Sequence, residues 1–320
     1  MERREAGVPI PLQWDGQPGP AHVATVETAN RLFDFVPQAL HRVQGAAGAP
    51  LTPHAAILEP LATGGGMAVY KLTALFPQQQ TQQLVCKIPH QRRIVYTTAT
   101  DHQSTEDATR QLLDRLVTLA DHLAQRTPGL FPRSGGVWHW YAADGTPQHL
   151  LVEEFIPGLS VERLKLIYEQ AWLTQQMSPQ VYHQARTAVE RLAVATFLRL
   201  WQALDRRLFT SDPSPWNVLV QQPDAALTSQ SAATIIDLHG LEDDAGLAYV
   251  VQRLAAVYGM RQDMLEEVLI PGMLDALGEA EGRALLLAEL PRLEVEAERV
   301  RQNLGVDLQR PLLRLIRSLA

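Results

Sequence analysis

The chain has 320 residues, enough for one large domain or for two lobes that share a cleft, and this length excludes a small scaffold held by disulfides. Hydrophobic residues make up 46% and charged residues 20%, which excludes a disordered chain, and the formal net charge of −7 argues against a general nucleic-acid binder. The single cysteine, Cys86, cannot form an internal disulfide, and the first residues lack the apolar run of a signal peptide. No apolar run approaches the roughly 18 residues of a membrane span. We therefore expect a cytoplasmic protein without a membrane span.

Residues 1–50 are rich in Pro, Gly, Gln and Ala, and we interpret them as an N-terminal extension. Its apolar segment 31–43 fits a short helix. The next hundred residues carry strand signals, and a run of leucines at helical spacing that follows Glu106 predicts one amphipathic helix. The predicted strands are 55–62, 68–76, 83–88 and two within 136–156, which are joined at Asp144 and Gly145.

Beyond Gly158 the pattern becomes helical, and an apolar stripe over 185–204 predicts a buried helix. Two short strands follow, one after the loop 211–217 and one at 234–236, and residues 241–320 show only helical patterning. The predicted fold is therefore α+β and bilobal. It has an N-terminal extension 1–50, a strand-rich N-lobe 51–156, a hinge near 153–158 and a helical C-lobe 157–320.

Three glycines, Gly64, Gly65 and Gly66, lie between the first two predicted strands of the N-lobe. Residues without side chains let backbone N–H groups approach phosphate oxygens, so this cluster is a candidate phosphate loop. The alternative is a tight hairpin turn without a ligand.

Lysine is rare in this chain, and one of its three lysines, Lys87, lies in a predicted strand with apolar neighbours. A lysine on the inner face of a strand is costly unless it is paired. We expect its partner to be Glu106, in the first turn of the predicted helix. The alternative is an exposed strand lysine and a glutamate that is favoured there by the helix dipole.

Asp212 and Asn217 lie five residues apart in a proline-containing loop, and Asp237 follows the short strand 234–236. Carboxylate and amide oxygens are the protein ligands that Mg²⁺ prefers, so Asn217 and Asp237 are candidate metal ligands. Asp212 is a candidate base for a reacting hydroxyl. The alternative is that these side chains only cap turns beside proline.

These motifs together resemble the protein-kinase-like superfamily, and their details are closer to the aminoglycoside and choline kinase branch than to serine/threonine protein kinases. The resemblance covers about residues 57–260. It rests on the order of a glycine loop, Val-Cys-Lys, a helix glutamate, a Glu-Glu-Phe-Ile-Pro-Gly hinge, an Asp-x-x-x-x-Asn loop and Asp-Leu-His-Gly. The proline two residues before Asn217 is similar to the loop of the small-molecule kinases.

The resemblance implies a role for each polar residue of these motifs. Asp212 would be the catalytic-loop aspartate, and Asn217 and Asp237 would hold the metal. Lys87 would bind the α- and β-phosphates, and Glu106 would be its ion-pair partner. ATP and Mg²⁺ are the implied cofactors, bound in the cleft between the lobes.

The hinge carries the implied adenine contacts. Glu154 and Ile156 would supply them through the backbone, and Glu153 occupies the position that normally guards the back of the adenine pocket. After Gly240 there is no Ala-Pro-Glu motif and little room for an activation segment, which argues against a phosphorylation-regulated protein kinase.

Other positions depart from the family pattern. The usual first and third glycines of the loop are Ala62 and Met67, and Thr210 replaces the histidine two residues before the catalytic aspartate. The third motif has Leu238 and His239 at its centre, where phenylalanine is usual. These departures favour a pseudokinase, whereas the retained polar residues favour an enzyme.

The sequence thus predicts an ATP- and Mg²⁺-dependent phosphotransferase that transfers the γ-phosphoryl group to a hydroxyl of a small molecule or a protein. The alternative is a pseudokinase that binds nucleotide weakly or not at all and acts as a scaffold or regulatory protein. Adenylyl transfer on the same fold lacks support, because the glycine cluster contains no basic residue. The expected partners are ATP and the hydroxyl acceptor, with a protein partner at the C-terminal helices as a further option.

Overall fold

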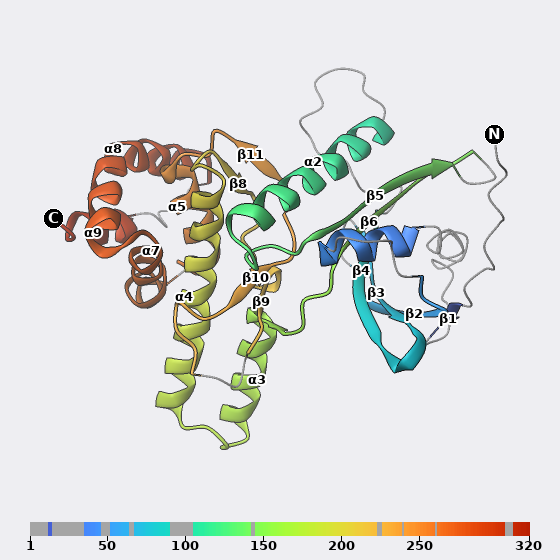
Figure 1. Cartoon of the computed structure of the whole chain (residues 1–320). Helices are drawn as coiled ribbons and strands as arrows, with labels where there is room; N and C mark the ends of the chain where they lie inside the picture. The colour runs from blue at the N-terminus through green and yellow to red at the C-terminus, as the bar shows by residue number, and fades with distance from the viewer. Residues whose placement is uncertain are drawn as a thin grey trace. The chain divides into compact units, whose positions relative to one another are not determined.

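The computed structural model describes residues 12–14, 35–45, 52–63, 67–89, 105–141, 145–222, 226–238, 240–259, 261–304 and 310–320. The chain divides into two compact units (Figure 1), the first comprising residues 1–122 and 132–155 and the second residues 123–131 and 156–320. Strands dominate the first unit and helices the second. The predicted combination of antiparallel strands and helices is therefore confirmed.

A six-stranded sheet forms the first unit, with its strands in the order β1-β2-β3-β4-β6-β5. All neighbours pair antiparallel except β1 and β2, which are parallel. The strands are β1 (Leu12–Trp14), β2 (Ala55–Thr63), β3 (Met67–Leu75), β4 (Thr81–Pro89), β5 (Ser134–Tyr141) and β6 (Pro147–Glu154). The predicted strands and hairpin are present, and β1 is a strand that the sequence analysis did not predict. A 3₁₀ turn, η2 (Pro77–Gln79), connects β3 to β4.

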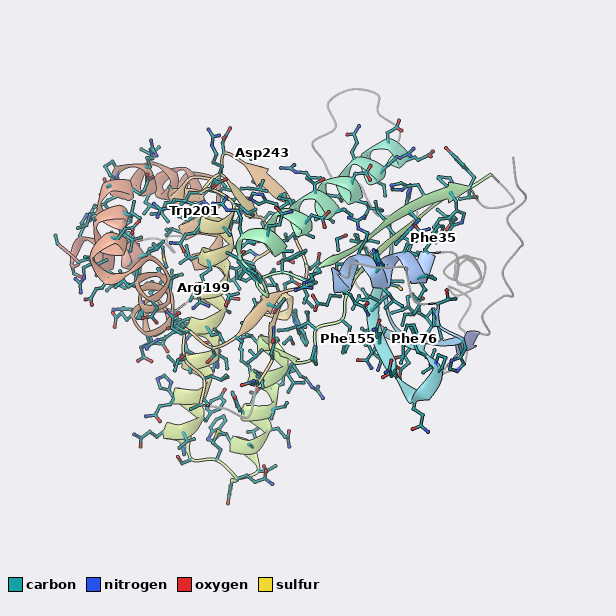
Figure 2. The ribbon with its side chains drawn as sticks, viewed as in Figure 1. Phe35, Phe76, Phe155, Arg199, Trp201 and Asp243 are labelled. Carbon is teal, nitrogen blue, oxygen red and sulfur yellow. The ribbon has the colours of Figure 1, made fainter. Side chains whose placement is uncertain are left out.

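One face of this sheet is the apolar core of the unit. Along β3 buried residues such as Leu72 alternate with partly buried ones, as expected for a strand with one face in a core. A helix over residues 35–44 packs on this face, and the ring of Phe35 lies 4.9 Å from that of Trp138 (Figure 2). Cys86 belongs to the same core, where burial raises the pKa of its thiol to about 12. The cysteine is therefore a packing residue and not a nucleophile.

The helix α2 (Thr105–Arg126) packs on the opposite face of the sheet. The His139 Nε2 atom on β5 lies 3.5 Å from a carboxylate oxygen of Asp114 on α2. The Tyr141 hydroxyl, two residues further along β5, donates a hydrogen bond to Glu106. Strand residues two apart share a face, so these contacts and the Phe35 contact with Trp138 lie on opposite sides of the sheet.

The second unit consists of helices with short strands between them. Its helices are α3 (Val161–Leu173), α4 (Pro179–Ala203), α5 (Leu247–Tyr258), α6 (Gln262–Met264), α7 (Ile270–Leu277), α8 (Glu279–Leu304) and α9 (Arg310–Arg317), with a π-helical turn, η4 (Leu265–Leu269), before α7. Its strands are β7 (Leu159–Ser160), β8 (Leu208–Thr210), β9 (Val218–Val220), β10 (Ala233–Ile235) and β11 (Leu241–Asp243).

The helix α4 is the centre of this unit, and the predicted apolar stripe is buried along it from Val189 onward, whereas Ala185 is partly buried. The indole N–H of Trp201 on α4 (Figure 2) donates to the carbonyl of Ala245, 2.7 Å away, just before α5. At the C-terminal end, Leu312, Leu313 and Ile316 of α9 are buried, and α9 packs on α8. The apolar face of α9 is therefore part of the core of this unit.

The connection 123–131 belongs to the second unit, although the sequence analysis placed it in the N-lobe. The backbone N–H of Ile235 on β10 donates to the carbonyl of Leu130, and the Thr234 hydroxyl donates to the carbonyl of Gly129. These bonds attach the end of α2 to a strand about a hundred residues later in the chain. Such a long-range contact leaves no periodic signal in the sequence.

None of the helices in the described part of the chain combines the length and the apolar character that a membrane crossing requires.

Candidate active site

The second unit brings two polar loops side by side. The first, 211–217, connects β8 to β9 and ends in a 3₁₀ turn, η3 (Pro215–Asn217), and the second, 236–240, connects β10 to β11. Because β9 pairs with β10 and β8 pairs with β11, both ends of the two loops adjoin. The Ile236 N–H donates to the Asn217 carbonyl at 2.9 Å, and the Ser211 N–H donates to the Gly240 carbonyl at 2.8 Å.

Hydrogen bonds orient Asp212 and Asn217 within the first loop. The Asn217 Nδ2 atom donates to the Asp212 carbonyl at 3.3 Å and to a carboxylate oxygen of Asp212 at 3.4 Å. The Asp212 N–H donates to the hydroxyl of Thr210, which is buried, whereas the side chain of Asp212 is exposed. Because the amide nitrogen of Asn217 donates to Asp212, the Oδ1 oxygen is the atom of this amide that could bind a cation.

Asp237 follows directly after Ile236, the residue that is bonded to the Asn217 backbone, and its side chain is partly buried. The loop that carries it depends on Gly240, whose φ is +54°. A Cβ atom at that position would overlap the Ser211 side chain, and the residue that carries it would have to adopt a positive φ, so glycine favours the close approach of the two loops. The structure therefore places Asp212, Asn217 and Asp237 on adjoining loops of one unit.

The donor set of these loops fits Mg²⁺. Asn217 offers an amide oxygen and Asp237 a carboxylate, both hard oxygen ligands, and Mg²⁺ commonly binds through one or two carboxylates while it keeps several waters or phosphate oxygens. Among the described residues no group of three or more His, Cys, Asp and Glu side chains is placed to hold a metal ion. A site made only of such side chains, as for structural zinc, is therefore not found in the described part of the chain.

In the first unit, Lys87 lies on β4 and is buried, with 7% of its surface exposed. Its ammonium lies 2.8 Å from a carboxylate oxygen of Glu153 on β6, which is itself 3% exposed. The sequence analysis expected Lys87 to be paired, because an unpaired buried ammonium is costly. The structure pairs Lys87 with Glu153 on the neighbouring strand, whereas Glu106 contacts Tyr141.

Glu106 is bonded elsewhere. It accepts a hydrogen bond of 2.7 Å from the exposed Tyr141 hydroxyl, and this bond, together with the negative charge of Glu106, raises the pKa of Tyr141. The first turn of α2 therefore contacts the edge strand β5. Glu153 lies on β6, which is the direct neighbour of the strand β4 that carries Lys87. The predicted pairing of Lys87 with Glu106 is replaced by these two separate contacts.

The remaining predicted residues are Glu154, Ile156 and the three glycines. Glu154 is the last residue of β6, and its backbone N–H donates to the Arg133 carbonyl at 2.9 Å. Ile156 begins the long second segment of the second unit. The glycines Gly64, Gly65 and Gly66 lie outside the described residues, between the paired strands β2 and β3. Adenine contact by Glu154 and Ile156 and phosphate contact by the glycines stay predictions.

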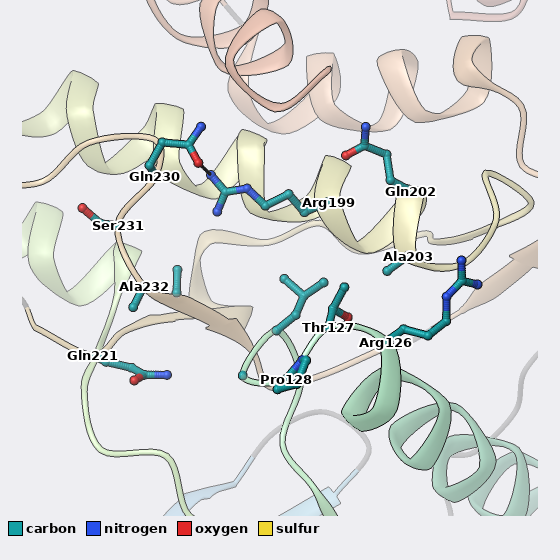
Figure 3. Close-up of a pocket in the computed structure, with 13 residues that line it drawn as sticks. Arg126, Thr127, Pro128, Arg199, Gln202, Ala203, Gln221, Gln230, Ser231 and Ala232 are labelled. Carbon is teal, nitrogen blue, oxygen red and sulfur yellow. Dashed lines mark hydrogen bonds between the residues drawn. The ribbon is translucent and has the colours of Figure 1, made fainter. Parts of the chain in front are cut away.

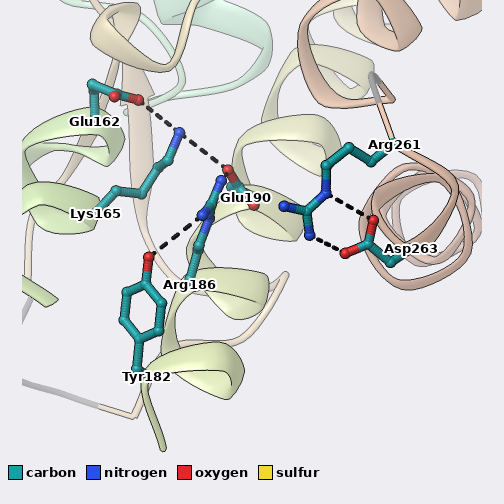
Figure 4. A network of polar contacts seen from close by, with 7 residues as sticks. All are labelled: Glu162, Lys165, Tyr182, Arg186, Glu190, Arg261 and Asp263. Carbon is teal, nitrogen blue, oxygen red and sulfur yellow. Dashed lines mark hydrogen bonds and ion pairs between the residues drawn. The ribbon is translucent and has the colours of Figure 1, made fainter. Parts of the chain in front are cut away.

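A network of charged residues joins α3 to α4 (Figure 4). The Lys165 ammonium lies 2.8 Å from Glu162 and 3.1 Å from Glu190, a residue with 3% exposure that also pairs with Arg186. The hydroxyl of Tyr258 is buried and has no hydrogen-bond partner among the described residues. Burial, and after it the charges of Glu190, Glu162 and Asp212, raise its pKa well above the usual value. Since α3 also packs on η3, this network supports the loop that carries Asp212.

A pocket of about 700 Å³ lies elsewhere in the second unit (Figure 3). Arg199 on α4 donates from its guanidinium to the Ser229 carbonyl and, at 3.3 Å, to the Gln230 side chain. Arg199 therefore contacts the segment between β9 and β10. Burial lowers the pKa of the Arg199 guanidinium. The predicted site residues are not among those that line this pocket, which are Arg126–Leu130, Arg199, Gln202, Ala203, Gln221 and Gln230–Ala233.

No family model matches the sequence, and no curated protein matches it either. Among solved structures the chain is similar to one described as "WaaP in complex with acyl carrier protein", with 15% sequence identity and a TM-score of 0.41. The similarity covers 86% of this chain and 97% of the other.

Proposed function

We propose that the chain is a phosphotransferase with a protein-kinase-like fold, which uses ATP and Mg²⁺ to phosphorylate a hydroxyl of a small molecule or a protein. The observation that carries this proposal is the pair of adjoining loops in the second unit. They hold Asp212, Asn217 and Asp237 together through the backbone bonds of Ser211 and Ile236. An aspartate, an asparagine and a second aspartate are the side chains that phosphoryl transfer requires in protein kinases.

The residues of the two loops would have different roles in the reaction. Asn217 and Asp237 would hold Mg²⁺, which supplies positive charge to the phosphates when it is bound. The exposed carboxylate of Asp212 would accept the proton of the acceptor hydroxyl, and the Asn217 amide, which is bonded to it, would fix its direction. Thr210 occupies the position of the family histidine. Its hydroxyl accepts a hydrogen bond from the Asp212 N–H, and this bond would position the start of the loop.

The first unit supports the same proposal. In protein kinases the phosphate-binding lysine lies on the third strand of the N-lobe sheet and is followed by a helix. Lys87 lies on β4, the third strand of the antiparallel run β2-β3-β4, and α2 is the next described element. Lys87 would neutralise charge on the α- and β-phosphates, and the segment that joins β2 to β3 would cover them.

The small-molecule branch of the superfamily is the finer part of the proposal. After Asp237 the chain enters β11, which ends at Asp243, and α5 begins at Leu247. This short connection leaves no length for the long activation segment of a regulated protein kinase. The cytoplasmic location and a protein partner at the C-terminal helices stay predictions.

The pseudokinase is the second candidate, and one observation favours it. Glu106, the helix glutamate that the family pattern pairs with the lysine, is bonded to Tyr141. A scaffold that has lost nucleotide binding would tolerate this change. Absence of nucleotide binding would therefore favour the pseudokinase, whereas catalysed phosphoryl transfer would establish the enzyme.

The enzyme is expected to bind ATP in a Mg²⁺-dependent way. A ligand that binds only the folded state stabilises it by RT ln(1 + [L]/Kd), about 2.7 kcal/mol at a hundredfold excess over Kd. We expect the melting temperature to rise by several degrees in MgATP and to rise much less when EDTA removes the metal, as thermal unfolding would measure. An unchanged melting curve in millimolar MgATP would favour the pseudokinase.

A further inference from the structure

We infer that Glu153, and not Glu106, is the residue that positions Lys87 for the nucleotide. This inference rests on the proposed function, because it names the residue that orients the phosphate-binding lysine of that site. It departs from the family pattern, in which a glutamate on the helix has this role.

The strand register explains why the two side chains meet. In the antiparallel pair of β4 and β6, Lys87 lies opposite Leu151 and Val85 lies opposite Glu153. Residues two apart on a strand share a face, so Lys87 and Glu153 are diagonal neighbours on one face of the sheet. Diagonal neighbours lie about 7–8 Å apart between backbones, a distance that a lysine and a glutamate can bridge.

Burial makes this contact specific. Both side chains are almost fully covered, and a buried charge is retained only when an opposite charge or hydrogen bonds compensate for it. Loss of the Glu153 charge would remove a buried counter-charge that lies 2.8 Å from the Lys87 ammonium. The lysine would then lose the position from which it can reach a phosphate.

The pair is also independent of the helix. Both partners belong to adjacent strands of one sheet, whereas Glu106 lies in the first turn of α2 and is bonded to Tyr141 on β5. In a kinase whose lysine is held by a helix, the position of that helix controls the lysine. Here the strand residue Glu153 would position Lys87, so changes at Glu106 would leave this ion pair in place.

The rarity of lysine allows a direct test of the pair without any nucleotide. The chain has lysines only at positions 71, 87 and 165, so isotopic labelling of lysine gives three side-chain ammonium signals in NMR. The other two lysines pair with Glu59 and with Glu162, and they serve as internal controls. Lys71→Arg and Lys165→Arg variants assign the signals.

We expect Glu153→Gln to shift the Lys87 signal and to leave the other two in place, which also shows that the fold is intact. Glu106→Gln, which removes the same charge from the helix, is the matched control and should leave all three signals unchanged. If Glu106→Gln shifts the Lys87 signal and Glu153→Gln does not, the inference is overturned. Should Glu153→Gln fail to fold, Glu153→Asp keeps the charge, withdraws the carboxylate by one methylene and is expected to shift the same signal.

The positioning role itself is tested by nucleotide affinity. We expect Glu153→Gln to weaken MgATP binding by about tenfold or more, as for a lost charge-assisted contact, and Glu106→Gln to leave affinity within about twofold. An unchanged affinity in Glu153→Gln with a shifted Lys87 signal would reduce the pair to a structural contact. A wild-type protein that does not bind MgATP would contradict the proposed function instead, and the signals would still decide which glutamate holds Lys87.

Discussion

Replacement of Asp212 by asparagine is expected to reduce phosphoryl transfer by about 10² or more, the contribution typical of a general base. The side chain is exposed on the loop 211–217, where it can meet an acceptor hydroxyl. Asparagine has the same shape and retains an oxygen that can accept the hydrogen bond from Asn217. The substitution therefore removes the basic charge and keeps the loop.

The measurement for Asp212→Asn is the rate of γ-phosphoryl transfer to an acceptor or of ATP hydrolysis by the protein, together with the affinity for MgATP. We expect the rate to fall and the affinity to change little. Asp244→Asn is the matched control, because Asp244 is an exposed aspartate of the same unit, at a positive φ that asparagine also adopts. If Asp212→Asn weakens MgATP binding and leaves the rate unchanged, the role of base is assigned to the wrong residue.

Replacement of Asp237 by asparagine is expected to lower the affinity for MgATP, the quantity that Asp212→Asn should leave nearly unchanged. It removes the charged ligand that the proposal gives to Mg²⁺, a hard cation with a preference for carboxylate oxygens. We expect MgATP affinity to fall about a hundredfold, equivalent to about 2.7 kcal/mol, because the metal no longer joins the phosphates to the protein. The stabilisation that MgATP adds to the wild-type protein should then largely disappear.

Calorimetric titration with ATP in the presence and absence of Mg²⁺ measures this effect. Asp237→Asn should bind ATP with nearly the same affinity under both conditions, whereas the wild type and Asp244→Asn should prefer MgATP. A variant that keeps the full Mg²⁺ preference would show that Asp237 does not hold the metal.

Local patterns predicted the regular elements of the fold well. The alternation along β3 and the apolar stripe of α4 are both periodic, and both elements were found where the periodicity placed them. The strands β7, β8 and β11 have only two or three residues each. They are too short to carry a period, and β11 was therefore missed within a region that otherwise reads as helical.

The candidate site was predictable only in part, for a physical reason. Asp212 and Asn217 lie five residues apart, so their contact is local and could be expected from the loop. The partner of Lys87 is set by the register of β4 and β6, strands that are more than fifty residues apart in the chain. The sequence did contain one signal for Glu153, which is its position in an apolar strand. A glutamate that is buried in such a strand requires an opposite charge, as a buried lysine does.

A crystal structure with Mg²⁺ and a non-hydrolysable ATP analogue tests the central claim most directly. The account predicts a metal ion about 2.1 Å from Oδ1 of Asn217 and from a carboxylate oxygen of Asp237, the distance normal for Mg²⁺. It also predicts that the Lys87 ammonium contacts the α- or β-phosphate while it stays paired with Glu153. A nucleotide bound without contact to Lys87, or a metal that ignores both Asn217 and Asp237, would contradict the account.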